Sequence, residues 1–192
     1  MDDPGASRIR IRPLRRSDAA ALAPLLRDGQ VTRFLPPRVR RESSKAFVAR
    51  VLREQRAGEG FSFAVHRAGS REAIGQIRLF RWSRFESEAE VGFWLRRSAW
   101  GHGYATEALE LLAARAFRRE RLHRLAATVV EGNLRSARVL EKVGFRREGR
   151  RRGAARIDRQ WVDLIEFGLL REEWERGRAR GRASKRRAGR SG

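Results

Sequence analysis

The chain has 192 residues, of which 41% are hydrophobic, so it is long and apolar enough to bury the core of one domain. It has no cysteine and no run of about 18 apolar residues, which excludes disulfide bonds, thiolate zinc sites and a membrane-spanning helix. The opening stretch MDDPGASRIRIRPL lacks the charged start and apolar centre of a signal peptide. We therefore expect a cytoplasmic protein with no membrane attachment.

Arginine carries almost all of the excess charge. The formal net charge is +22, and lysine occurs only at Lys45, Lys142 and Lys185. A basic field of this kind attracts phosphates, nucleic acids or acidic protein surfaces. The alternative is an arginine-rich solvated surface with no such partner, and the composition leaves both readings open.

The first half of the chain alternates strand and helix patterns. Ile9 and Ile11 alternate with arginines, Ser17 and Asp18 are good helix-capping residues, and paired prolines interrupt the next apolar stretch. These patterns predict, in chain order, a strand over 8–15, a helix from Asp18 to Gly29, a loop over 31–37, a helix over 42–57 and a hairpin of strands over 61–67 and 73–82.

The second half continues in the same manner and shows no internal repeat. Gly144 follows an apolar helical pattern at the position that favours a left-handed helix end. The patterns predict a strand over 88–96, a helix over 104–119, a strand over 125–130, a helix over 135–145 and a last strand over 161–170.

The composition changes near residue 175. The stretch RGRARGRASKRRAGRSG, residues 176–192, has no acidic residue and no large apolar side chain. Such a segment cannot bury a core, so we expect a folded domain over 8–174 and a basic, disordered tail over 175–192. The tail is a candidate contact for RNA or the ribosome through phosphate neutralisation, and a merely solubilising end is the alternative.

The stretch WGHGYATEAL, residues 100–109, places two glycines at the start of a predicted helix. The first backbone N–H groups of a helix have no partners, and glycines let the backbone approach an anion closely. The spacing is not that of a P-loop, and Thr106 stands where a dinucleotide-binding fingerprint has its third glycine. Taken by itself, this stretch fits either a phosphate-binding loop or a purely structural turn.

A second stretch, GNLRSARVLEKVGFRREG at residues 132–149, adds to this pattern. Together with EVGFWL, WGHGYATEAL and WVD at 161–163, it resembles the GNAT superfamily of acetyl-CoA-dependent N-acetyltransferases, in the family's order and spacing. The resemblance covers roughly residues 8–174 and is strongest to the RimJ/RimL-like branch, which acetylates ribosomal-protein N-termini. It implies an α/β (α+β) fold with a central, mixed, mostly antiparallel twisted sheet of about seven strands flanked by about four helices.

The resemblance also implies where coenzyme A binds. Backbone amides of the glycine loop would receive the pyrophosphate, and the pantetheine arm would run between the strands at 90–96 and 125–130. The residues so implied are Leu95, Arg97, His102, Gly103, Tyr104, Ala105, Thr106 and Asn133. The His102 side chain occupies a variable loop position and is not expected to be catalytic. No metal is expected, because the three histidines are scattered.

Glu90 is the first candidate for the general base. Members of the superfamily transfer the acetyl group by direct attack of the amine, and a glutamate at about this place serves many relatives as the base. Strand alternation puts Glu88, Glu90 and Gly92 on one face. A solvated edge carboxylate is the alternative role of Glu90. Glu148 and Asp163 are lesser candidates, expected to pair with arginines.

The candidate acid differs from the common pattern of the superfamily. Many relatives use a tyrosine that, counted from Asn133, falls on Leu140 in this chain. Ser136 is the remaining hydroxyl, and it could hydrogen-bond the departing thiolate. Its alternative role is to cap the helix.

We expect the acceptor to be a protein N-terminal α-amine. Neutralising an α-amine of pKa ~7.8 at pH 7 costs roughly 1 kcal/mol, against about 4.6 kcal/mol for a lysine of pKa ~10.4, which suits a site with a single base. Acetylation of a small amine, such as a polyamine, aminoglycoside or amino acid, remains an alternative. So does a non-catalytic module that binds acyl-CoA or RNA. The chain is expected to be a monomer or a homodimer.

Overall fold

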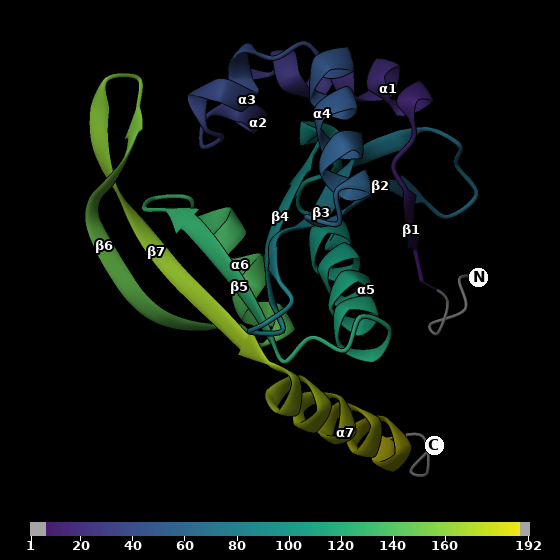
Figure 1. Ribbon diagram of the computed structural model, residues 1–192. Coiled ribbons are helices and arrows are strands. Elements are labelled where there is room, and N and C mark those ends of the chain that lie inside the picture. Colours follow the sequence, from purple (N-terminus) through teal and green to yellow (C-terminus); the bar gives the residue numbers. More distant parts are fainter. Residues whose placement is uncertain (1–6, 189–192) are drawn as a thin grey trace.

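The computed structural model describes residues 7–188, and one twisted seven-stranded sheet organises it (Figure 1). The strand order is β1-β2-β3-β4-β5-β7-β6. The strands are β1 (Ile9–Pro13), β2 (Phe61–Arg67), β3 (Ala73–Ser83), β4 (Glu88–Leu95), β5 (Arg124–Val130), β6 (Arg146–Ile157) and β7 (Gln160–Leu170). Among the strands of the described residues, only β4 and β5 pair in parallel, so the mixed, mostly antiparallel sheet that the family resemblance implies is confirmed.

Four helices cover the two faces of the sheet and enclose two apolar cores. The helices α1 (Ala19–Arg27) and α4 (Ser44–Arg56) pack on one face, and α5 (Tyr104–Arg118) and α6 (Leu134–Val143) contribute to the core on the other. Strand β4 serves both cores, because Ala89 and Val91 face the α5 side while Trp94 packs among residues of α1 and α4. Apolar alternation on β4 therefore holds the two layers together.

The loop predicted over 31–37 is shorter in the structure, at 33–36, because a short helix lies on each side of it. These are α2 (Gly29–Thr32) and α3 (Pro37–Arg41). The Asp28 side chain accepts a hydrogen bond from the Gln30 amide at 2.9 Å and so caps α2. Pro37 occupies the first turn of α3, where its missing N–H costs nothing. The prolines thus separate two short helices instead of preventing helix formation.

Strand β6 has no counterpart among the predicted elements. Its sequence, RREGRRRGAARI, lacks apolar alternation, and its residues are mostly exposed. It becomes a strand because it pairs antiparallel with β7 along nearly its whole length, from Arg146 opposite Gly168 to Ile157 opposite Gln160. Figure 1 shows the β6–β7 hairpin extending well beyond the rest of the sheet.

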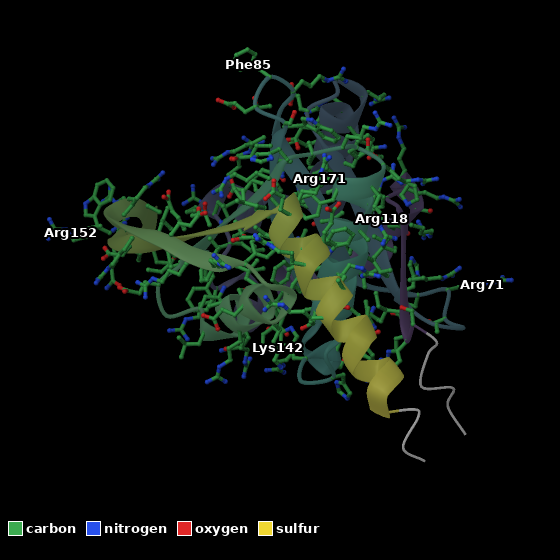
Figure 2. All side chains as sticks on the ribbon, turned by 90° about the horizontal axis from the view of Figure 1, so that it is seen from below. Arg71, Phe85, Arg118, Lys142, Arg152 and Arg171 are labelled. Carbon is green, nitrogen blue, oxygen red and sulfur yellow. The ribbon has the colours of Figure 1, made fainter. Side chains whose placement is uncertain are left out.

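The C-terminal segment is helical where disorder was expected. Helix α7 spans Arg171–Ala188, which corrects the expectation for residues 175–188, and residues 189–192 lie outside the described part. Arginine, alanine and lysine are good helix formers, so the segment can continue a helix whose start is anchored. Figure 2 shows Arg118, Lys142 and Arg171 on the face around α7. That this basic segment contacts RNA or the ribosome stays a prediction.

Trp174 provides the anchor of α7. Its side chain is 5% exposed and lies 5.3 Å from the Phe117 ring of α5, measured between ring centroids. The guanidinium groups of Arg118 and Arg178 lie over the same indole, at 5.2 and 5.1 Å from its centroid. None of the helices that the structure describes is both long and apolar enough to span a membrane.

Replacing Trp174 with Ala is expected to lower the free energy of unfolding by about 3 kcal/mol, because it leaves a cavity between α5 and α7. Urea denaturation followed by far-UV circular dichroism measures this. Trp161→Ala is the matched control, since Trp161 is 69% exposed and its loss should change stability little. Equal losses of stability in the two variants would contradict this account of α7.

Candidate active-site groove

The parallel pair β4 and β5 separates part of the way along its length. The register joins Glu88 to Arg124, Ala89 to Leu125 and Glu90 to Ala126, and no later pair between these strands follows. Figure 1 shows β5 diverging from β4 beyond this point. A groove of about 1650 Å³ lies there and is lined by both strands. The separation leaves part of the β4 edge free to hydrogen-bond a ligand as a neighbouring strand would.

The glycine loop lies at one end of this groove. Gly101 and Gly103 have φ values of 80° and 81°, in the left-handed region that favours glycine, and Gly103 is the N-cap of α5. Tyr104, Ala105 and Thr106 form the first turn of α5 and line the groove. The free amides and positive dipole end of a 15-residue helix therefore face the groove, as an anion site requires.

The His102 side chain is turned to the loop itself. Its Nδ1 lies 2.8 Å from the Trp100 carbonyl oxygen, and its ring stacks on Tyr104 at 5.4 Å between centroids. Its carbonyl accepts a hydrogen bond from Arg8 at 2.9 Å, while Arg8 also pairs with Glu107 of α5. His102 is not among the groove-lining residues, so its side chain stabilises the loop.

Of the two β4-side residues named for the pantetheine arm, the structure brings one to the groove. Leu95 lines it, and its carbonyl accepts a hydrogen bond from Trp100 Nε1 at 2.9 Å. Arg97 begins the short 3₁₀ turn Arg97–Ala99, does not line the groove, and lies 3.7 Å from Asp28 through its Nε. The Trp100 indole thus ties the glycine loop to the end of β4.

Asn133 and Ser136 lie together at the start of α6. The Asn133 side chain accepts a hydrogen bond from the Ser136 amide at 3.4 Å, so Asn133 is the helix cap. The half-buried Ser136 lines the groove. Leu140, in the position where many relatives carry tyrosine, also lines the groove, but it is 1% exposed, belongs to the core and has no hydroxyl. Ser136 is therefore the hydroxyl that α6 presents to the groove.

Glu90 lines the groove where β4 and β5 part. Its side chain is 13% exposed, and its Oε2 accepts a hydrogen bond from Arg81 at 2.9 Å. Arg81 itself is 77% exposed, so this ion pair is solvated on one side and easily rearranged. The carboxylate is thus held at the groove without being locked in place.

Glu54 is a second groove carboxylate that sequence patterns did not single out. It accepts hydrogen bonds from Arg50 at 2.8 Å and from Arg78 at 2.7 Å. Burial alone raises the pKa of Glu54, but the two arginines outweigh burial, and its net pKa lies below the ordinary value. A carboxylate held in this way is a poor proton acceptor, so Glu90 remains the better candidate base.

The two lesser candidates pair with arginines, as the sequence predicted. Arg124 binds both oxygens of Glu148 at 2.7 and 2.6 Å, and this pairing holds the pKa of Glu148 below its usual range. Asp163 accepts hydrogen bonds from the Gly153 amide at 2.8 Å and from Arg150 at 2.7 Å, which likewise lower its pKa. Both carboxylates brace β6 and lie outside the groove lining.

Basic side chains of α6 surround the glycine-loop end of the groove. Arg135 lies with its guanidinium 4.6 Å from the Trp100 ring centroid, and Arg138 and Lys142 also line the groove. Free helix amides, left-handed glycines and this positive charge together fit the phosphates of a nucleotide-like cosubstrate. Among the residues described, no three His, Asp or Glu side chains gather in a way that could hold a metal ion.

Comparison with known proteins identifies the family that this fold and groove define. The model of the acetyltransferase (GNAT) domain matches residues 8–146, and the chain belongs to this family. It is 29% identical over 122 residues to the [ribosomal protein uS5]-alanine N-acetyltransferase of Escherichia coli, covering 63% of each chain. Alignments to two N-acetyltransferases of Bacillus subtilis, 34% and 36% identical, span only 55% and 65% of those proteins.

Two solved structures share this fold. RimJ of Mycobacterium smegmatis, in complex with CoA-disulfide, superposes with a TM-score of 0.78 at 28% identity over 86% of this chain and 83% of that one. Spermidine N-acetyltransferase of Vibrio cholerae, in complex with CoA and spermine, superposes with a TM-score of 0.79 over 88% and 99%. The latter is 19% identical and shows the fold alone.

Proposed function

We propose that this chain is an acetyl-CoA-dependent N-acetyltransferase that acts on protein N-terminal α-amines, in the manner of the RimJ/RimL branch. One observation carries the proposal: a single groove runs from the amide-rich start of α5, past the parted edges of β4 and β5, to the carboxylate of Glu90. The family match and the two protein N-terminus acetyltransferases among the similar proteins support the same reaction.

Acetyl-CoA, when bound, supplies a thioester whose acyl group an amine can take directly. The amides of Gly103 to Thr106 would hold its pyrophosphate, and the free edge of β4 would align its pantetheine arm. Glu90 would accept the proton that an ammonium group must lose before it can attack. Ser136, with its hydroxyl on the groove, would donate a hydrogen bond to the sulfur.

The acceptor is the part of the proposal that needs a direct assay. The test is free-thiol release from acetyl-CoA with peptides that begin with alanine or serine, with spermidine and with an aminoglycoside. We expect turnover with the peptides. Turnover with spermidine alone would show that the chain acetylates small amines. CoA binding without turnover of any amine would show that the chain is a non-catalytic module.

Gly103→Ala is expected to weaken CoA binding about tenfold. A Cβ at φ 81° costs roughly 1–2 kcal/mol, so the substitution favours a different backbone conformation in which the amides no longer face a phosphate. Isothermal titration with CoA measures the Kd. Gly69→Ala is the matched control, since Gly69 has φ 75° in the β2–β3 turn, outside the groove. If both variants bind CoA as the parent does, the loop amides do not hold it.

Glu90→Gln is expected to lower kcat/KM for a peptide about a hundredfold at pH 7, because it removes the proton acceptor. The loss should shrink as the pH rises through ~7.8, where a free α-amine becomes neutral without help. The pH–rate profile measures this. Glu59→Gln, which changes an exposed groove carboxylate, is the control. A Glu90→Gln profile parallel to that of the parent would remove Glu90 from this role.

A further inference from the structure

A second cavity adjoins the groove where α3 meets the tip of the β6–β7 hairpin. It has a volume of about 580 Å³ and is lined by Pro37, Arg41, Arg156, Asp158 and Arg159. Pro37 and Arg156 line the main groove as well, so the two spaces lie next to each other. We call the smaller cavity the arginine mouth. It lies away from the residues assigned to acetyl-CoA.

An ion pair and a tight turn hold the arginine mouth in place. Arg40 of α3 binds the Asp158 carboxylate across the opening, with a distance of 3.0 Å between Nη2 and Oδ1. Asp158 and Arg159 form the two-residue turn of the hairpin, and both have positive φ, 47° and 68°. Positive φ at both central residues is the geometry of a type I′ turn, which is strained for an arginine. The turn therefore fixes the position of the Arg159 backbone, from which its side chain extends.

Charge in the arginine mouth is unbalanced. Arg40 already neutralises Asp158, and no ion pair joins Arg41, Arg156 or Arg159 to a carboxylate within the described residues. All three arginines are exposed. Exposed guanidinium groups gathered in a concave site are suited to bind carboxylates, often through two hydrogen bonds.

The positive charge of the main groove also makes it unsuited to bind a polyamine. Its carboxylates are Glu54, Glu59 and Glu90, and two of them are occupied by arginine partners. Two further carboxylates pair with groove arginines from outside the lining: Glu42 with Arg38 and Arg50, and Glu166 with Arg151. The arginines around the acceptor side still outnumber all five carboxylates, and they are Arg33, Arg38, Arg50, Arg78, Arg81, Arg151 and Arg156. A polycation would meet repulsion here, whereas an acceptor with acidic side chains near its amine would be attracted.

We propose that the arginine mouth binds acidic side chains of the acceptor's N-terminal segment, about seven to ten residues after the amine that is acetylated. Glu90 pairs with Ala126 and Ala126 with Gly168, whereas the mouth lies at the turn before β7, roughly 30 Å further along that strand. An extended peptide advances about 3.3 Å per residue, so roughly its seventh to tenth residues reach the mouth while its amine lies at Glu90. The mouth therefore selects acidic protein N-termini over neutral and basic ones. This inference rests on the proposed N-terminal acetyltransferase function.

The test compares three peptides that share their first six residues and differ over the next four, which alternate Asp and Glu, alternate Asn and Gln, or are all lysine. We expect kcat/KM for the acidic peptide to exceed that for the neutral one roughly threefold to tenfold at low salt, and the lysine peptide to be the poorest. Because the arginines are exposed, the preference should fall as ionic strength rises.

Arg41→Gln/Arg159→Gln should bring the ratio of kcat/KM for the acidic and neutral peptides close to one. Arg71→Gln is the control, because Arg71 lies in the β2–β3 turn, on the opposite side of the molecule from the hairpin (Figure 2). It should retain the parent's ratio. Circular dichroism and urea denaturation check that each variant is folded.

The outcomes separate this inference from the proposed function. Equal turnover of the acidic and neutral peptides, or a preference that survives in Arg41→Gln/Arg159→Gln, overturns the inference and leaves N-terminal acetylation standing. Turnover of spermidine with none of the three peptides overturns the proposed function itself.

Discussion

The point at which β4 and β5 part is the constraint on which the site depends. After Glu90 and Ala126 the two parallel strands cease to pair, although each continues to be paired on its other side, by β3 and by β7. A buried strand edge without partners is unfavourable, so the free edge calls for a ligand that can take the place of a strand. The helix start at Gly103 and the hydroxyl of Ser136 lie on the same groove. The parted strands therefore bring the glycine loop, the candidate acid and the candidate base into one space.

Arginine pairing decides which carboxylates are available for chemistry. Arg50 and Arg78 hold Glu54, Arg124 holds Glu148, and Arg150 holds Asp163. Each of these carboxylates has a lowered pKa and a structural partner, so none is a natural proton acceptor. Glu90 differs from them, because it lines the groove and its partner Arg81 is 77% exposed. The same excess of arginine makes the arginine mouth possible.

Local sequence predicted those elements whose apolar spacing matches one secondary structure. The hairpin of β2 and β3, the helices α4 and α5, and the left-handed end of α6 at Gly144 follow this rule. The strand β6 does not, because its arginines carry no alternation and it exists through its pairing with β7. Helix α7 continues past the predicted boundary because Trp174, packed on Phe117, anchors a segment of good helix formers. In these cases long-range contacts decided the structure.

The sequence by itself determined the glycine loop, since only glycine adopts the backbone of Gly101 and Gly103 without strain. Apolar periodicity also determined most of the strands and helices, though not β6 or the short helices α2 and α3. The tertiary structure decided which residues face the groove. It brought Leu95 and Ser136 to the groove, turned His102 into the loop and left Arg97 outside. It also gathered arginines from α3 and the β6–β7 turn, which are more than a hundred residues apart. The sequence specifies which side chains are charged. The folding of distant segments onto one another decides which groups those side chains contact, and local patterns carry no information about these contacts.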